Sequence, residues 1–93
     1  MLNMFSGRKR RVQRVLSGLS QKYELVSVDD GKEGLDVILR LNVPVTFKAL
    51  DELAGTFKTD KINIDKTEDG NSYYFGDRVS IYLYDIKEET LNG

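Results

Sequence analysis

Residues 35–41 alternate cleanly between two kinds of side chain. Leu and Val occupy the odd-numbered positions, and Asp36, Ile38 and Arg40 occupy the even-numbered ones. Because successive side chains of a strand point to opposite faces, we expect a strand with one apolar face and one mixed face. The apolar face has to pack against another layer, which the rest of the chain must supply.

Two segments repeat apolar residues with the period of a helix and can form that layer. The first is predicted over residues 7–20, with Ser6 as its N-cap. The second begins after a predicted cap at Thr46 and ends near residues 56–59. The expected buried stripes are Val12, Val15, Leu16 and Leu19 in the first helix and Phe47, Leu50, Leu53, Ala54 and Phe57 in the second.

Further segments carry strand patterns and are separated by turn residues. Residues 23–28 are rich in Val, Leu and Tyr, and we expect them to form a hairpin with residues 35–41 across a six-residue loop. After the second helix we expect strands at residues 62–67, 72–75 and 78–85, the first two joined by a tight turn at Asp69-Gly70.

The order of these elements is α-β-β-α-β-β, with a fifth strand compatible with the pattern. We predict an α+β fold: an antiparallel sheet of four or five strands with two helices on one face. A ferredoxin-like sheet with permuted chain ends has this order, a likeness of topology alone. The 93 residues form one predicted domain, with a basic amphipathic helix segment (1–22), an α+β body (23–86) and a loose acidic tail (87–93).

The absence of Cys and His removes many chemistries. The chain has no disulfide framework, no thiol or imidazole catalysis, and no zinc site of the Cys or His type. Residues 65–70 resemble the start of a calcium loop, but Gly76 stands where the bidentate Glu is due, and a β-turn explains the same residues. Acidic residues between positions 29 and 36 are likewise explained by a turn. We therefore expect no enzyme activity, no metal and no cofactor.

Charge is divided unevenly along the chain. Residues 1–22 carry six basic side chains and no acidic one, and the remainder carries a formal charge of −7, giving the net charge of −1. An asymmetry of this kind is a hint of an interaction segment, although the basic segment can equally dock on the protein's own acidic body. The expected cationic surface comprises Arg8, Lys9, Arg10, Arg11 and Arg14.

Aromatic residues concentrate in the last predicted strands. If both helices cover one face of the sheet, these residues lie on the opposite, open face. Such a face can stack single-stranded bases, seal a dimer or receive a partner protein, and Tyr is also simply common in strands. The expected aromatic surface comprises Tyr73, Phe75, Arg78, Tyr82 and Tyr84.

These patterns favour a small binding module. The first hypothesis is protein–protein interaction, as an adaptor, assembly component or inhibitor, through the acidic Tyr-rich sheet or the basic helix, with a protein partner or self-association. The alternative is nucleic-acid binding through the helix residues 8–14. A third is contact with a membrane surface through residues 2–11. We expect a cytoplasmic location, because an apolar start followed by basic residues reverses the order of a secretory signal.

Overall fold

The computed structural model describes residues 3–41, 45–65 and 79–92, and the side chains among them from Gly7 to Leu91. Two α-helices, four strands and a short 3-10 helix make up this part of the chain. In order they are α1 (Asn3–Ser17), β1 (Glu24–Asp30), β2 (Leu35–Leu41), α2 (Phe47–Phe57), β3 (Ile62–Asp65), β4 (Val79–Ile86) and the 3-10 helix η2 (Glu88–Asn92).

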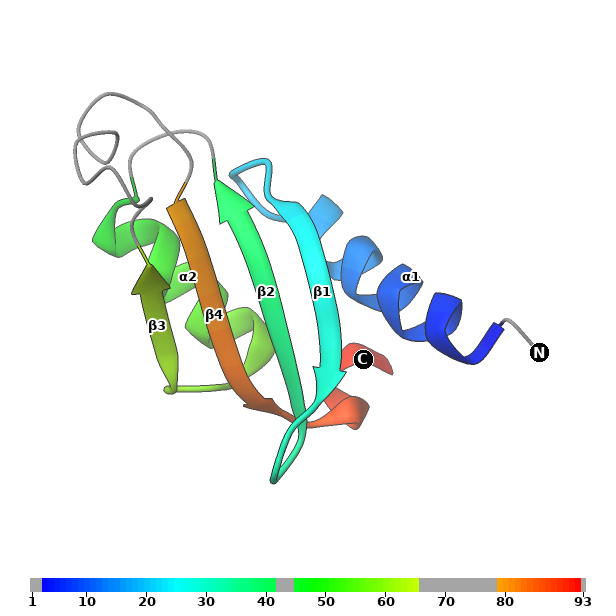
Figure 1. The fold of residues 1–93 in the computed structure, drawn as a ribbon. Helices are drawn as coiled ribbons and strands as arrows, with labels where there is room; N and C mark the ends of the chain where they lie inside the picture. Colours follow the sequence, from blue (N-terminus) through cyan, green and yellow to red (C-terminus); the bar gives the residue numbers. More distant parts are fainter. Residues whose placement is uncertain (1–2, 42–44, 66–78, 93) are drawn as a thin grey trace.

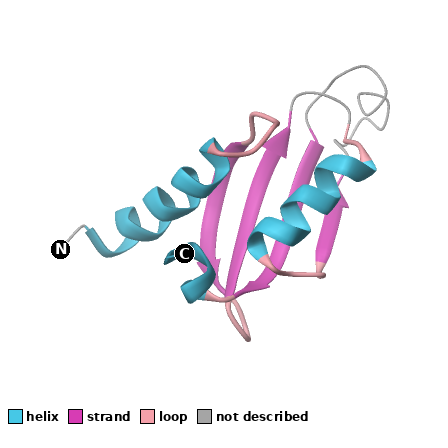
Figure 2. Cartoon of the chain, turned by 180° about the vertical axis from the view of Figure 1, so that it is seen from behind, coloured by secondary structure: helices cyan, strands magenta, loops and turns pink. Residues whose placement is uncertain are grey.

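The four strands form one antiparallel sheet in the order β1-β2-β4-β3. Strand β4 lies between β2 and β3, so β2, α2 and β3 form a split β-α-β unit. Both helices lie on the same face of the sheet, which stands in front of them in Figure 1 and behind them in Figure 2. The predicted α+β class, element order and one-sided helical layer are thus confirmed.

The hydrophobic core lies between the helices and the sheet. The odd-numbered residues of β2, which were predicted to point inward, are at most 2% exposed, and Val79, Ile81 and Leu83 of β4 are at most 1% exposed. Helix α1 adds Val12 and Leu16, and helix α2 adds Leu53 and Phe57. Burial of this layer supplies the main favourable term for folding.

Helix α2 begins as the sequence predicts, but its buried stripe differs. The Thr46 hydroxyl accepts a hydrogen bond from the Ala49 N–H at 3.1 Å, as an N-cap should. The prediction that Phe47 is buried is wrong, because its side chain is 88% exposed. The sheet-facing positions are Ala49, Leu53 and Phe57, which recur every fourth residue, and Phe47 lies outside that stripe.

Helix α1 is shifted toward the N-terminus relative to its prediction. It begins at Asn3, so Ser6 is inside the helix and not its cap, and it ends at Ser17. Beyond that end, the Gly18 N–H donates to the Val15 carbonyl at 3.1 Å. A hydrogen bond from residue i to residue i−3 is of the 3-10 type and tightens the last turn of the helix. Gly18 also lowers the propensity of the chain to continue as an α-helix.

The first hairpin is longer than expected, and the tail is not loose. Pairing of β1 with β2 continues to Asp30 and Leu35, so the connection is a tight turn in which the Gly31 N–H donates to the Gly34 carbonyl at 2.7 Å. Against the prediction for residues 87–93, Glu88–Asn92 form the 3-10 helix, and Leu91 is only 5% exposed in the core. One apolar side chain is enough to hold this segment on the body. The predicted strand at 72–75, the Asp69-Gly70 turn and the fifth strand lie outside the described residues.

Candidate functional site

The face of the sheet opposite the helices, the open face, is defined by the strand register. Residues directly opposite one another on neighbouring strands share a face. Two cross-strand rows run from β1 to β3, and a third row lies at the end of β1 and β2 that is next to their turn. The open face comprises Glu24, Ser27 and Asp29 of β1, Asp36, Ile38 and Arg40 of β2, Ser80, Tyr82 and Tyr84 of β4, and Asn63 and Asp65 of β3.

An aromatic strip crosses the middle of the open face. The rings of Tyr82 and Tyr84 stack along β4, with centroids 6.3 Å apart and planes inclined by 13°. Ile38 lies opposite Tyr82 on the neighbouring strand. All three side chains are half-buried. The sequence predicted Tyr82 and Tyr84 on this face, and the structure places them there. The other predicted members, Tyr73, Phe75 and Arg78, lie outside the described residues.

Carboxylates surround this strip. Among the residues that the structure describes, the open face holds four carboxylates (Glu24, Asp29, Asp36 and Asp65) and one guanidinium (Arg40), which leaves a formal charge of −3. Asp29 and Asp36 lie directly opposite each other on β1 and β2. Like charges in this arrangement destabilise a sheet. Neither carboxylate forms an ion pair with any described residue. The open face is therefore acidic, with an unfavourable pair at its end.

A bulge distorts β4 beside that pair. Leu35 pairs with Ile86 and Val37 with Leu83, so two residues of β4, Tyr84 and Asp85, stand opposite Asp36 alone. Asp85 adopts φ 60°, a left-handed conformation that non-glycine residues seldom hold. The Asp36 carboxylate accepts a hydrogen bond from the Asp85 N–H at 3.3 Å. The bulge re-aims the Asp85 side chain out of the regular strand alternation.

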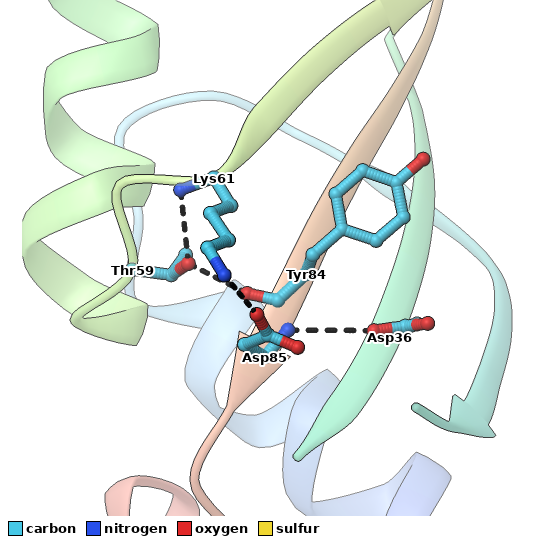
Figure 3. A network of polar contacts seen from close by, with 5 residues as sticks. All are labelled: Asp36, Thr59, Lys61, Tyr84 and Asp85. Carbon is cyan, nitrogen blue, oxygen red and sulfur yellow. Dashed lines mark hydrogen bonds and ion pairs between the residues drawn. The ribbon is translucent and has the colours of Figure 1, made fainter. Parts of the chain in front are cut away.

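Lys61 fixes this distorted end of β4, as Figure 3 shows. Its ammonium donates to the Asp85 carboxylate at 2.7 Å. That hydrogen bond holds the pKa of Asp85 below its ordinary value and raises the pKa of Lys61. The Thr59 hydroxyl donates to the Tyr84 carbonyl at 2.6 Å and accepts from the Lys61 N–H at 3.2 Å. The network ties the segment before β3 to β4 and leaves Asp85 neutralised.

A cleft of about 340 Å³ lies over this network and adjoins the aromatic strip through Tyr84. Four parts of the chain meet there: the β1–β2 turn, β2, β4 and the segment before β3. The cleft is lined by Lys32, Glu33, Asp36, Lys61, Tyr84 and Asp85. No group of three or more metal-ligating side chains occurs among the described residues.

Helix α1 carries the predicted cationic surface, but the structure divides it. Arg8 lies 3.0 Å from a carboxylate oxygen of Asp30 and 3.7 Å from one of Glu88, and Arg11 lies 3.3 Å from Glu88. The prediction that these two arginines belong to a free cationic face is therefore corrected, because they dock on the protein's own acidic groups.

The remaining predicted cations are Lys9, Arg10 and Arg14, which are exposed. None of them forms an ion pair with a described residue. We call these three residues the free basic face of α1. The side chains of Leu2, Met4 and Phe5, on which the membrane hypothesis rests, lie outside the described part.

The end of α1 is also held to α2. The Ser20 N–H and hydroxyl both donate to the Glu52 carboxylate, at 3.2 Å and 2.8 Å to its nearest oxygens. Tyr23 is 8% exposed below this contact, and its hydroxyl has no hydrogen-bond partner among the described residues. Burial, and then the charge of Glu52, raise the pKa of Tyr23. Ser20 and Glu52 are 32 residues apart in sequence, and only the fold reveals this link.

Within the described ranges, no helix is both long and apolar enough to cross a membrane. Searches against protein-family models, curated proteins and solved structures find no match to this chain.

Proposed function

We propose that this protein is a non-enzymatic interaction module that binds a protein partner on the open face of its sheet. One observation carries the proposal. Both helices and η2 pack on the same side, so no described element covers the strip of Ile38, Tyr82 and Tyr84. Tyrosines with an apolar body and a polar tip are enriched where proteins meet, because they contribute large contact area at low entropic cost.

The charges around the strip define what kind of surface it suits. An acidic rim repels nucleic-acid phosphates and attracts cationic protein surfaces. The absence of His and Cys leaves the chain without the commonest general base and nucleophile. Binding without catalysis is the function that this chemistry supports, and a cytoplasmic location is part of the proposal.

The test uses the wild type, one doubly substituted variant and one singly substituted variant as baits in an extract of the native host. Tyr82→Ser with Tyr84→Ser removes the aromatic strip, while Phe47→Ser removes an aromatic ring of similar size that is 88% exposed on α2. A partner retained by the wild type and by Phe47→Ser, lost by the double variant, is then purified and its affinity measured by calorimetry. Equal binding of that purified partner to all three proteins would refute the proposal.

A second candidate is nucleic-acid binding through the free basic face of α1. Its support is the exposure of Lys9, Arg10 and Arg14 without ion pairs to described residues. Three phosphate contacts would give a log–log salt slope of about −3 on duplex DNA. Arg10→Gln with Arg14→Gln should reduce the magnitude of that slope by about 2. No measurable affinity for DNA or RNA at low salt would eliminate this candidate.

A further inference from the structure

We propose that the partner of the open face is a second copy of this chain, whose free basic face of α1 docks across the sheet. The contact is head-to-tail: the helix of one molecule on the sheet of the next. This inference rests on the proposed function, since it uses the same open face, and it adds the identity of the partner.

The two surfaces cannot meet within one molecule. Helix α1 lies on the covered side of the sheet (Figures 1 and 2) and adds Val12 and Leu16 to the core. The strand register places Tyr82 and Tyr84 on the other side. The two arginines that can reach acidic groups of their own chain, Arg8 and Arg11, already do so. Contact between the remaining basic residues and the open face can therefore form only between separate molecules.

The charges of the two surfaces are opposite in sign. Arg10 and Arg14 lie about 40° apart around the helix, with Lys9 about 100° from Arg10, and the described residues of the open face carry a formal charge of −3. Arg10 and Arg14 are one helical turn apart, about 6 Å along the axis. Alternate residues of a strand, which share a face, are about 7 Å apart. The carboxylates lie in the two outer rows of the open face, and the uncharged row of Ile38 and Tyr82 lies between them. One guanidinium of the helix can thus reach an outer row while the next lies over the tyrosine rings.

The local chemistry of the open face suits a guanidinium in two ways. A cation between Asp29 and Asp36 would remove the like-charge repulsion that the free protein tolerates there. The stacked rings of Tyr82 and Tyr84 offer a broad aromatic face next to it, and arginine stacks favourably on such faces. Each of these terms is small in water, so we expect association that is weak and sensitive to salt.

Unlike a two-fold dimer, this contact joins two different patches of each molecule. A contact of that kind leaves one patch free at each end of every assembly, so it adds further copies as concentration rises. It also predicts complementation. A molecule with a damaged helix surface retains its sheet surface, and a molecule with a damaged sheet surface retains its helix.

The test is sedimentation velocity of nuclease-treated protein at about 0.1 M and about 1 M salt, where the screening length falls from about 10 Å to about 3 Å. Wild type should associate at low salt and dissociate at high salt. The helix variant, Arg10→Gln with Arg14→Gln, and the sheet variant, Glu24→Gln with Asp29→Asn, should each associate about fivefold more weakly, as expected for two exposed charges. Lys48→Gln with Asp51→Asn, on exposed positions of α2, is the matched control and should behave as wild type.

Mixing the helix and sheet variants gives the decisive result. The mixture should recover one contact of wild-type strength per pair, so 1:1 heterodimers should form at concentrations where each variant alone is monomeric. A wild-type protein that is monomeric at both salt concentrations, or a mixture no more associated than its components, would overturn the inference. The bait experiment with the Tyr82 and Tyr84 variant tests the proposed function separately. If that variant fails to retain a partner other than this chain itself, the proposed function stands even when the self-association is refuted.

Discussion

Replacing Asp29 with Asn should make the fold more stable. Asp29 is exposed on β1 and lies directly opposite Asp36 on β2. Opposed side chains of an antiparallel pair have Cβ atoms about 5 Å apart. Two unit charges about 6 Å apart repel by about 0.7 kcal/mol in water. Measured cross-strand effects span about 0.2–1 kcal/mol, so we expect Asp29→Asn to raise the free energy of unfolding by about 0.5 kcal/mol.

The assay is thermal and urea unfolding of dilute protein, below the concentration at which it associates. A gain of about 0.5 kcal/mol corresponds to a melting temperature about 2–4 °C higher for a domain of this size. The gain should shrink as salt rises from about 0.1 M to about 1 M, because screening weakens the repulsion that is being removed. Asp51→Asn on the exposed surface of α2 is the control, and it should change stability by less than about 0.5 kcal/mol.

This combination of effects separates function from folding. If Asp29 is retained to bind a cation, the same substitution that stabilises the monomer should weaken its association. A destabilised Asp29→Asn variant, or a gain that does not depend on salt, would refute the reasoning from cross-strand repulsion.

Four other substitutions test the fold. Leu91→Ala should lower the free energy of unfolding by about 2 kcal/mol because its side chain is in the core, whereas a loose tail would give a change within about 0.5 kcal/mol in urea unfolding. Gly34→Ala should cost about 1–3 kcal/mol, since its added carbon would lie 2.6 Å from a backbone oxygen of β4, while Gly55→Ala, with open space around it, should stabilise helix α2 by about 1 kcal/mol. Lys61→Met tests the ion pair: the lowered pKa of Asp85 gives stability that is present above its ordinary value of 3.8 and is lost as pH falls through the folded value. The urea midpoint of wild type should therefore fall more steeply than that of Lys61→Met between about pH 5 and pH 2, and equal slopes would contradict the assignment.

Local sequence signals predicted the elements that local chemistry controls. The alternation of residues 35–41 gave the strand with its boundaries, and Thr46 was identified as a cap because its hydroxyl acts within its own turn. The one-sided arrangement followed from the same patterns, since two amphipathic helices and alternating strands have few ways to share a core.

Features that depend on distant parts of the chain could not be predicted in this way. Arg11 and Glu88 are 77 residues apart in sequence, and only the folded chain brings them together. The burial of Leu91 depends on η2 reaching the core beside α1, and one Leu in an acidic tail gives no periodic signal. The bulge at Asp85 arises from the register of β2 with β4, which no local pattern specifies.

The open face illustrates the same division. Alternation placed Tyr82 and Tyr84 on one side of their strand, and the structure agrees. The pairing of Asp29 with Asp36 required the turn between β1 and β2 to be four residues long, shorter than expected, because the longer loop left Asp29 outside the strand. Because the turn is shorter than predicted, Asp29, which the sequence assigned to a solvated acidic turn, belongs to the open face.

The most direct measurement of the central claim is paramagnetic relaxation between two copies of the chain. The protein contains no cysteine, so Gln13→Cys places a single spin label on the exposed side of α1 near the free basic face. Labelled protein at natural isotope abundance is mixed with unlabelled, nitrogen-15-enriched protein at low salt. We predict broadening of the amide signals of Ile38, Tyr82 and neighbouring open-face residues of the enriched copy, and its loss in high salt. Broadening confined to the helical side, or no broadening at low salt, would contradict the claim.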